Sequence, residues 1–278
     1  ANPLQAMLTA VVRRQAELVA QWQLLGFIHG VMNTDNMLLS GETIDYGPCA
    51  FMDGFDNDAV FSSIDHAGRY AYRNQAHIAH WNLARLTQAL LPLLDENQER
   101  AIEKGQSVID GFPALVQAAY RDGMRKKLGL TGDEPDDIPL IQELLELMQQ
   151  HGSDFTLTFR RLWELAAPEG QLDGSISSFF DLDPAYGPWL QRWQTRFNQD
   201  AGATTTRVKD MLSVNPVFIP RNHLVEEAIV AAETCLDFTP FHKLVEVVTQ
   251  PFDFDAALEH YAKPPLPGQE VRQTFCGT

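Results

Sequence analysis

Residues His29–Pro48 of this 278-residue chain read HGVMNTDNMLLSGETIDYGP. An Asp and an Asn stand side by side as Asp35 and Asn36, and a second Asp follows at Asp45. The run between them, MLLSGETI, predicts two short strands around a turn at Ser40–Gly41, because Ser and Gly favour turns. Carboxylate and amide oxygens are the ligands that Mg²⁺ and Mn²⁺ prefer. This stretch is therefore a candidate metal site.

The spacing in this stretch resembles the catalytic loop of protein kinases. That loop reads His-x-Asp-x-x-x-x-Asn and leads into Asp-Phe-Gly; its first Asp takes the substrate's hydroxyl proton, and the Asn and the second Asp hold metal ions. His29 and Asn36 keep this spacing, and Asp45-Tyr46-Gly47 stands for the Asp-Phe-Gly. Val31 occupies the position of the base, but Asp35 is a replacement carboxylate directly before the Asn.

Each polar residue of the stretch has a structural alternative. Asp-Tyr-Gly alone ordinarily marks a turn, but joined to Asn36 at this spacing Asp45 is better interpreted, with Asn36, as a metal ligand. Asp35 is the candidate general base, and the alternative is an Asp that caps a turn through its own backbone. Because Asp35 and Asn36 are adjacent, their side chains are expected to diverge. We expect His29 to support the loop by a hydrogen bond near Asp45.

The strings HGVMNTDNM and TIDYGP together resemble the selenoprotein O family, which comprises kinase-like proteins that transfer a nucleotide monophosphate to protein hydroxyls. The resemblance covers essentially the whole chain. It continues in SIDHAGRYAYRNQ (Ser63–Gln75), WNLARLTQAL (Trp81–Leu90), YRDGMRKKLGL (Tyr120–Leu130), SVNPVFIPRN (Ser213–Asn222), YAKPP (Tyr261–Pro265) and the C-terminal Cys276.

This resemblance implies a protein adenylyltransferase that moves AMP, or UMP, to Ser, Thr or Tyr hydroxyls, with ATP as co-substrate and Mg²⁺ or Mn²⁺ as cofactor. By the same resemblance the α-phosphate of ATP faces the hydroxyl, and pyrophosphate leaves. Asp45 and Asn36 would bind the metal, and Asp45 would also bind the nucleotide. Asp35 would be the catalytic base. An ordinary kinase that transfers the γ-phosphate and a non-catalytic pseudokinase module remain as alternatives.

In that family, as in kinases, a nucleotide-binding N-lobe precedes the catalytic loop. The loop here begins at residue 29, and the sequence has neither G-x-G-x-x-G nor G-x-x-x-x-G-K-[ST]. We therefore expect residues 1–278 to form a C-lobe with a helical extension and no N-lobe. Its parts are a catalytic loop at 29–36, a metal-binding tripeptide at 45–47 and an activation segment at 45–70. Alone, this lobe is expected to be inactive, because two lobes clamp the nucleotide.

Apolar residues recur at three- and four-residue spacing along most of the chain, which predicts a mainly α-helical kinase-like C-lobe with a short β-hairpin at the catalytic loop and additional C-terminal helices. The first helix is predicted at Leu4–Leu25, ending at Gly26. Further helices are predicted at Ala76–Leu94, Glu96–Ser107, Phe112–Leu128, Leu140–His151, Ser153–Leu165, Pro184–Asn198, Ala203–Ser213, His223–Leu236, Pro240–Gln250 and Phe254–Tyr261.

The net charge of −16 argues against nucleic acid and anionic membranes as partners. No apolar run approaches the ~18 residues of a membrane span, and no signal-peptide pattern opens the chain. Arg121, Arg125, Lys126 and Lys127 are expected to form a solvated basic helix face. Together with the few cysteines and the family resemblance, these features predict a bacterial cytoplasmic protein.

Three cysteines, Cys49, Cys235 and Cys276, are too few for a disulfide framework and lack a C-x-x-C spacing. The family resemblance links the C-terminal Cys to redox control through a bridge to the activation segment. The bridging position aligns with Phe61, so Cys49 is the available partner. A Cys49–Cys276 disulfide and free thiols both stay open, and we favour free thiols. Cys235 is expected to be a buried helix residue.

Overall fold

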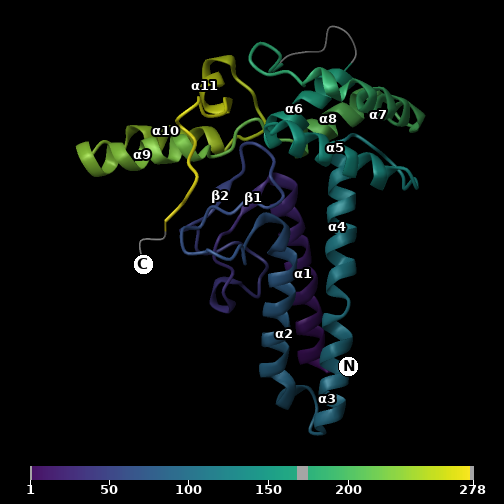
Figure 1. Ribbon diagram of the computed structural model, residues 1–278. Coiled ribbons are helices and arrows are strands. Elements are labelled where there is room, and N and C mark those ends of the chain that lie inside the picture. Colours follow the sequence, from purple (N-terminus) through teal and green to yellow (C-terminus); the bar gives the residue numbers. More distant parts are fainter. Residues whose placement is uncertain (1, 168–174, 276–278) are drawn as a thin grey trace. The chain divides into compact units, whose positions relative to one another are not determined.

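The structure is a computed structural model that describes residues 2–167 and 175–275 (Figure 1). The chain divides into two compact units. Among the described residues, the first unit comprises 2–50, 57–123 and 273–275, and the second comprises 51–56, 124–167 and 175–272. None of the described helices is long and apolar enough to cross a lipid bilayer.

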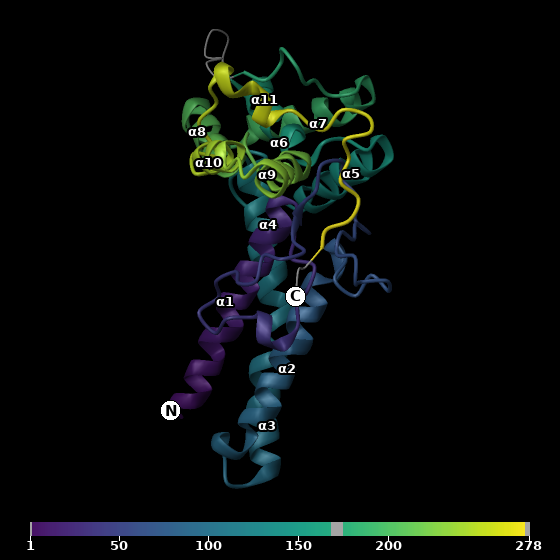
Figure 2. The same cartoon turned by 90° about the vertical axis from the view of Figure 1, so that its left-hand side faces the viewer.

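The first unit is built on three helices, α1, α2 and α3, that pack against one another (Figures 1 and 2). A two-stranded antiparallel sheet pairs β1 with β2, and the candidate loop runs between these strands. The elements are α1 (Pro3–Leu25), β1 (Phe27–Ile28), η1 (Thr34–Asn36), β2 (Ala50–Phe51), η2 (Tyr72–Asn74), α2 (Gln75–Leu94), α3 (Gln98–Ile109) and α4 (Phe112–Lys127), which continues into the second unit.

Helix α1 confirms the first predicted helix. The Asn2 side chain accepts a hydrogen bond from the Leu4 backbone N–H (2.9 Å), and Pro3 occupies the first turn, where its missing N–H costs nothing. The helix ends at Gly26, whose φ of 69° is the left-handed conformation that glycine adopts readily. A fixed C-terminus for α1 sets the point at which the chain enters β1 and the candidate loop.

The β-hairpin predicted around Ser40–Gly41 is wrong. Residues 37–44 contain a turn but no strand. Gln15 Nε2 of α1 donates a hydrogen bond to the Leu38 carbonyl (2.5 Å), and Trp22 Nε1 donates to Thr43 Oγ1 (2.9 Å). Side chains of α1 thus bind polar groups on both arms of the turn, so the segment lies on a helix instead of pairing with itself.

Helices α2 to α10 confirm the predicted helices from Ala76–Leu94 to Pro240–Gln250, with α5 beginning three residues earlier than expected. The predicted helix at Phe254–Tyr261 is instead a 3₁₀ turn, η4, followed by one turn of helix, α11. The elements are α5 (Asp137–His151), α6 (Phe155–Ala166), η3 (Pro184–Tyr186), α7 (Gly187–Gln199), α8 (Thr204–Val214), α9 (Asn222–Cys235), α10 (Thr239–Val248), η4 (Ala256–Leu258) and α11 (Glu259–Ala262).

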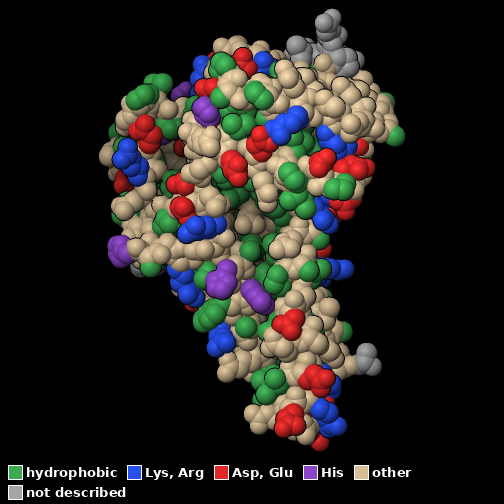
Figure 3. All heavy atoms as spheres, turned by 45° about the vertical axis from the view of Figure 1, so that its right-hand side comes forward, with side chains coloured by type: hydrophobic (Ala, Val, Ile, Leu, Met, Phe, Trp, Pro, Cys, Tyr) green, Lys and Arg blue, Asp and Glu red, His purple; other side chains and the backbone are tan. Residues whose placement is uncertain are grey.

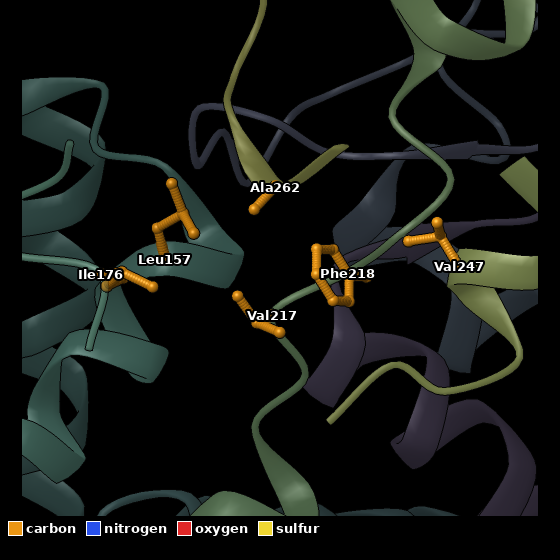
Figure 4. Close-up of a cluster of buried hydrophobic side chains, with 6 residues drawn as sticks. All are labelled: Leu157, Ile176, Val217, Phe218, Val247 and Ala262. Carbon is orange, nitrogen blue, oxygen red and sulfur yellow. The ribbon is translucent and has the colours of Figure 1, made fainter. Parts of the chain in front are cut away.

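A cluster of buried apolar side chains joins the helices of the second unit (Figure 4). Helices α6, α10 and α11 each contribute one residue, and the other residues come from the segments between helices. Segments that lack regular structure are therefore held by apolar packing. The cluster consists of Leu157, Ile176, Val217, Phe218, Val247 and Ala262.

Charged side chains of both signs are scattered over the face presented in Figure 3. The predicted solvated basic face on α4, however, is wrong for two residues. Arg125 is buried, and its Nε donates to Asp137 Oδ2 (3.0 Å). Lys127 is buried with its Nζ 4.2 Å from the Phe159 ring centroid, and this burial lowers its pKa to about 7. Arg125 and Lys127 are two residues apart and so leave α4 in different directions, and each meets a buried partner from another helix of the unit.

We expect Asp137→Ala to destabilise the second unit by roughly 3–5 kcal/mol, because it removes the buried carboxylate that pairs with two buried guanidinium groups. Asp137 is fully buried and also accepts a hydrogen bond from Arg196 Nε (2.7 Å). Urea unfolding followed by circular dichroism measures the change. The exposed Asp210→Ala is the control and should stay within about 0.5 kcal/mol of wild type. Equal stability of the two variants would contradict a structural role for Asp137.

Candidate functional site

The candidate loop presents Asp35 and Asn36 on the 3₁₀ turn η1. Successive residues of a 3₁₀ helix point roughly 120° apart, so the two side chains leave the turn in different directions. Asp35 is exposed and Asn36 is half-buried. Within the described part of the chain, the Asp35 carboxylate makes no hydrogen bond or ion pair. No hydrogen bond therefore supports the alternative in which Asp35 caps a turn.

Asn36 faces the backbone of its own loop. Its Nδ2 donates a hydrogen bond to the Val31 carbonyl (3.0 Å), and because a carbonyl only accepts, this bond assigns the amide nitrogen. The amide oxygen is thereby left as the group that can bind a metal ion. The side chain that matches the kinase Asn is thus oriented by its loop before any ligand arrives.

Asp45 is exposed and has a φ of 59°, a left-handed backbone conformation that is uncommon outside glycine. Asp tolerates this conformation better than most residues, because its short polar side chain bonds locally. The Gly47 N–H donates to Asp45 Oδ1 at 3.4 Å. Residues in such conformations concentrate at ligand sites. Asp45 therefore forms an Asx turn with its carboxylate exposed, and its role as a metal ligand stays a prediction.

The buried imidazole of His29 links these two segments. Its Nε2 donates to the carbonyl of Ile44 (2.7 Å), and its Nδ1 accepts from the Val31 N–H (3.4 Å). Both bonds are made by a neutral ring with its proton on Nε2. Burial lowers the pKa of His29, which outweighs the opposing effects of the Ile44 carbonyl and the Asp45 charge. The ring is accordingly neutral at neutral pH.

The contacts of His29 form a continuous relay between the two candidate ligands. Asp45 follows Ile44, whose carbonyl binds His29; His29 binds the N–H of Val31, and the Val31 carbonyl binds Asn36. This relay brings the Asn36 loop and the Asp45 segment together. Asp35 is outside it, one residue before Asn36. The expectation that His29 supports the loop near Asp45 is confirmed.

Sequence reasoning missed two buried amides that hold this loop. Gln75 Oε1 accepts from the His29 backbone N–H (3.1 Å), and its Nε2 donates to the Phe27 carbonyl (2.9 Å). Asn82 Nδ2 donates to the Met32 carbonyl (2.9 Å). Both residues lie in strings that carry the family resemblance, and that position could have identified them as candidates.

One carboxylate and one amide, Asp45 and Asn36, fit a Mg²⁺ or Mn²⁺ ion that completes its shell with water and phosphate oxygens. Such an ion keeps several waters and rarely needs a cage made only of protein ligands. Across residues 2–167 and 175–275, no three or more His, Cys, Asp or Glu side chains gather in a way that could hold a metal ion.

The thiol of Cys49 is free and half-buried, and burial raises its pKa to about 11. At neutral pH it is therefore a poor nucleophile. The suggested disulfide to Cys276 falls outside the described residues. Cys235 is free and exposed, so the expectation of a buried Cys235 is wrong. It lies at the last position of α9, where the chain turns into a short loop.

Comparison with known proteins identifies the family of this chain. The family described as Protein adenylyltransferase SelO matches residues 1–249, and the chain belongs to that family. Proteins named Protein nucleotidyltransferase YdiU are 52% identical in Rhizobium etli, 51% in Bradyrhizobium diazoefficiens and 50% in Rhizobium meliloti. The alignments cover 100% of this chain and 55–56% of those proteins. The chain thus spans about half the length of the curated relatives it matches.

We expect His29→Gln to weaken the pH dependence of stability. Because the folded pKa of His29 is lowered, the unfolded state binds more protons below the unfolded pKa of about 6.5, and stability falls as the pH drops from there. The slope due to one such group is at most about 1.4 kcal/mol per pH unit. Gln removes this titration and can still donate to the Ile44 carbonyl.

Urea unfolding of the chain between pH 5 and 8 measures this slope. His77→Gln, at an exposed position on α2, is the matched control and should retain the wild-type slope. His223, whose pKa burial also lowers, contributes equally to all three proteins. An unchanged slope in His29→Gln would show that His29 is not held neutral by the fold.

Proposed function

We propose that this chain carries the catalytic loop of a protein nucleotidyltransferase that moves AMP from ATP, or UMP from UTP, to Ser, Thr or Tyr hydroxyls of proteins. The observation that supports the proposal is the relay through His29, which connects the backbone next to Asp45 with the backbone that binds Asn36. Membership of the SelO family and the names of the relatives support nucleotidyl transfer. The helical units then correspond to a kinase-like C-lobe, and the protein acts in the bacterial cytoplasm.

In this proposal Asp45 and the amide oxygen of Asn36 bind Mg²⁺ or Mn²⁺. The ion supplies charge neutralisation for the phosphate oxygens. Asp35 is exposed on η1 and points in a different direction from Asn36. In this proposal it accepts the proton of the acceptor hydroxyl. The hydroxyl oxygen forms a bond to the α-phosphorus, the bond from that phosphorus to the bridging oxygen breaks, and pyrophosphate leaves.

The test is transfer of label to proteins by the full gene product, incubated with a cell lysate, Mg²⁺ or Mn²⁺, and either α-labelled or γ-labelled ATP. We expect incorporation of the α-label only. Asp45→Asn should reduce incorporation by about 10²-fold or more, because it removes the ligand charge while Asn still tolerates the left-handed backbone. Incorporation of the γ-label would identify an ordinary kinase. If neither label is incorporated, the protein is a non-catalytic module.

We expect Asp35→Asn in the full gene product to slow transfer by roughly 10²–10⁴-fold and to leave the affinity for nucleotide unchanged, because a base acts on the hydroxyl and not on the nucleotide. Single-turnover transfer measures the rate, and calorimetric titration with metal and ATP measures the affinity. Asp210→Asn is the control, since Asp210 is an exposed carboxylate in the second unit. Parallel losses of rate and affinity in Asp35→Asn would indicate a structural Asp35.

A further inference from the structure

A cationic and aromatic cluster lies beside the candidate loop in the first unit. The guanidinium carbons of Arg69 and Arg85 are 5.0 and 5.3 Å from the centroid of the Trp81 ring, and that of Arg69 is 5.7 Å from the Tyr70 ring. Both arginines are exposed, and the Trp81 side chain is 42% exposed. We call Arg69, Tyr70, Trp81 and Arg85 the arginine–tryptophan patch.

The two guanidinium groups of this patch are available to a ligand. Neither Arg69 nor Arg85 forms an ion pair with any residue that the structure describes. The nearby carboxylate of Asp65 accepts hydrogen bonds from the backbone N–H groups of Arg69 and Tyr70 (2.8 and 2.7 Å). Stacking on an aromatic ring orients a guanidinium while its N–H donors, which lie in the plane, stay free for a carboxylate or phosphate.

The patch adjoins the residues of the proposed catalytic turn. The Tyr70 hydroxyl donates to Asn33 Oδ1 (2.8 Å), and Asn33 immediately precedes η1. Asn33 is two residues from Asp35, so the two Cα atoms are no more than about 7 Å apart. In contrast, the relay through His29 reaches Asn36 and Asp45 from the buried side of the loop. The patch is thus next to the proposed base, where the acceptor hydroxyl would lie.

A cavity of about 290 Å³ borders the same edge, and both Thr34 and Arg85 line it. Most of its other walls are apolar, and two buried amides, Gln15 and Asn82, also line it. Each amide nitrogen donates to a backbone carbonyl, but Gln15 Oε1 and Asn82 Oδ1 have no hydrogen-bond partner among the described residues. Both oxygens are buried, so the surface that the cavity offers to a ligand is mainly apolar. A ligand suited to this cavity therefore has an apolar group.

We propose that the arginine–tryptophan patch and this cavity bind the protein substrate, and select hydroxyls that have an acidic side chain and an apolar side chain within a few residues. The inference rests on the proposed nucleotidyl transfer. A peptide supplies both features: a carboxylate for the arginines and an apolar side chain for the cavity. A triphosphate has the negative charge but offers no apolar group.

The first measurement is fluorescence anisotropy of the full gene product with a labelled eleven-residue peptide that contains a central Ser flanked by Glu and Leu. The comparison peptide replaces each Glu by Gln. We expect the Glu peptide to bind about tenfold or more tightly than the Gln peptide, because hydrogen bonds to charged groups are stronger than neutral ones. Equal affinity for the two peptides would overturn the proposal.

The protein variants locate the preference. Arg69→Gln with Arg85→Gln should abolish the preference for Glu, and Arg69→Lys with Arg85→Lys should restore only part of it, because Lys lacks the planar fork. The control is Arg13→Gln with Arg100→Gln, which has the same net charge and alters two exposed arginines of the first unit that already have carboxylate partners. A loss of preference in the control, or its retention in the Gln variant, would contradict the proposal.

Two further arms separate the competing explanations. Tripolyphosphate is added as a competitor of the Glu peptide. If it displaces the labelled peptide at lower concentrations than the unlabelled peptide does, the patch binds phosphate and the proposal is overturned.

Transfer of α-label to the Glu peptide should show a KM raised about tenfold or more by Arg69→Gln with Arg85→Gln, at an unchanged kcat. If wild type binds the Glu peptide preferentially but transfers no label, the proposed function fails and the binding site stands.

Discussion

The neutral, buried imidazole of His29 is the constraint on which the candidate site depends. The loop that carries Asn36 and the segment that carries Asp45 are separate in sequence, and His29 hydrogen-bonds the backbone next to each. A buried ring nitrogen without a partner would cost roughly 1–3 kcal/mol, so the ring favours the arrangement in which both bonds form. Gln75 in turn fixes the backbone of His29 from the start of α2. A residue without a direct chemical role thus sets the geometry of those proposed to act.

Much of this architecture could be predicted from the sequence, because it follows from local periodicity and from caps. The helix ending at Gly26 and the nine helices from α2 to α10 follow the three- and four-residue apolar spacing. The hairpin at Ser40–Gly41 could not be predicted correctly, since its strand-like pattern was overridden by hydrogen bonds from Gln15 and Trp22 of α1. The burial of Arg125 and Lys127 depends on partners distant in sequence, which charge and period do not reveal.

The candidate site, too, could be predicted from the sequence only in part. Spacing selected Asp35, Asn36 and Asp45 as candidates, and a family resemblance implied roles for them that stay predictions. The sequence did not show that Asp35 points away from the relay while Asn36 is bound within it, because that difference arises from the 3₁₀ turn. The left-handed backbone of Asp45 was also hidden in the sequence, where Asp-Tyr-Gly reads as an ordinary turn. The three residues therefore differ in how far the protein has already positioned them.

The central claim is that Asn36 and Asp45 hold one ion between them, and a double-mutant cycle on the affinity for Mn-ATP tests it most directly. The dissociation constant is measured by calorimetry for the full gene product as wild type, Asn36→Ala, Asp45→Asn and the double variant. Ligands of one ion should be coupled, with the double variant departing from additivity by about 1 kcal/mol or more. Additive losses, within about 0.5 kcal/mol, would contradict a shared ion and separate the two residues into independent roles.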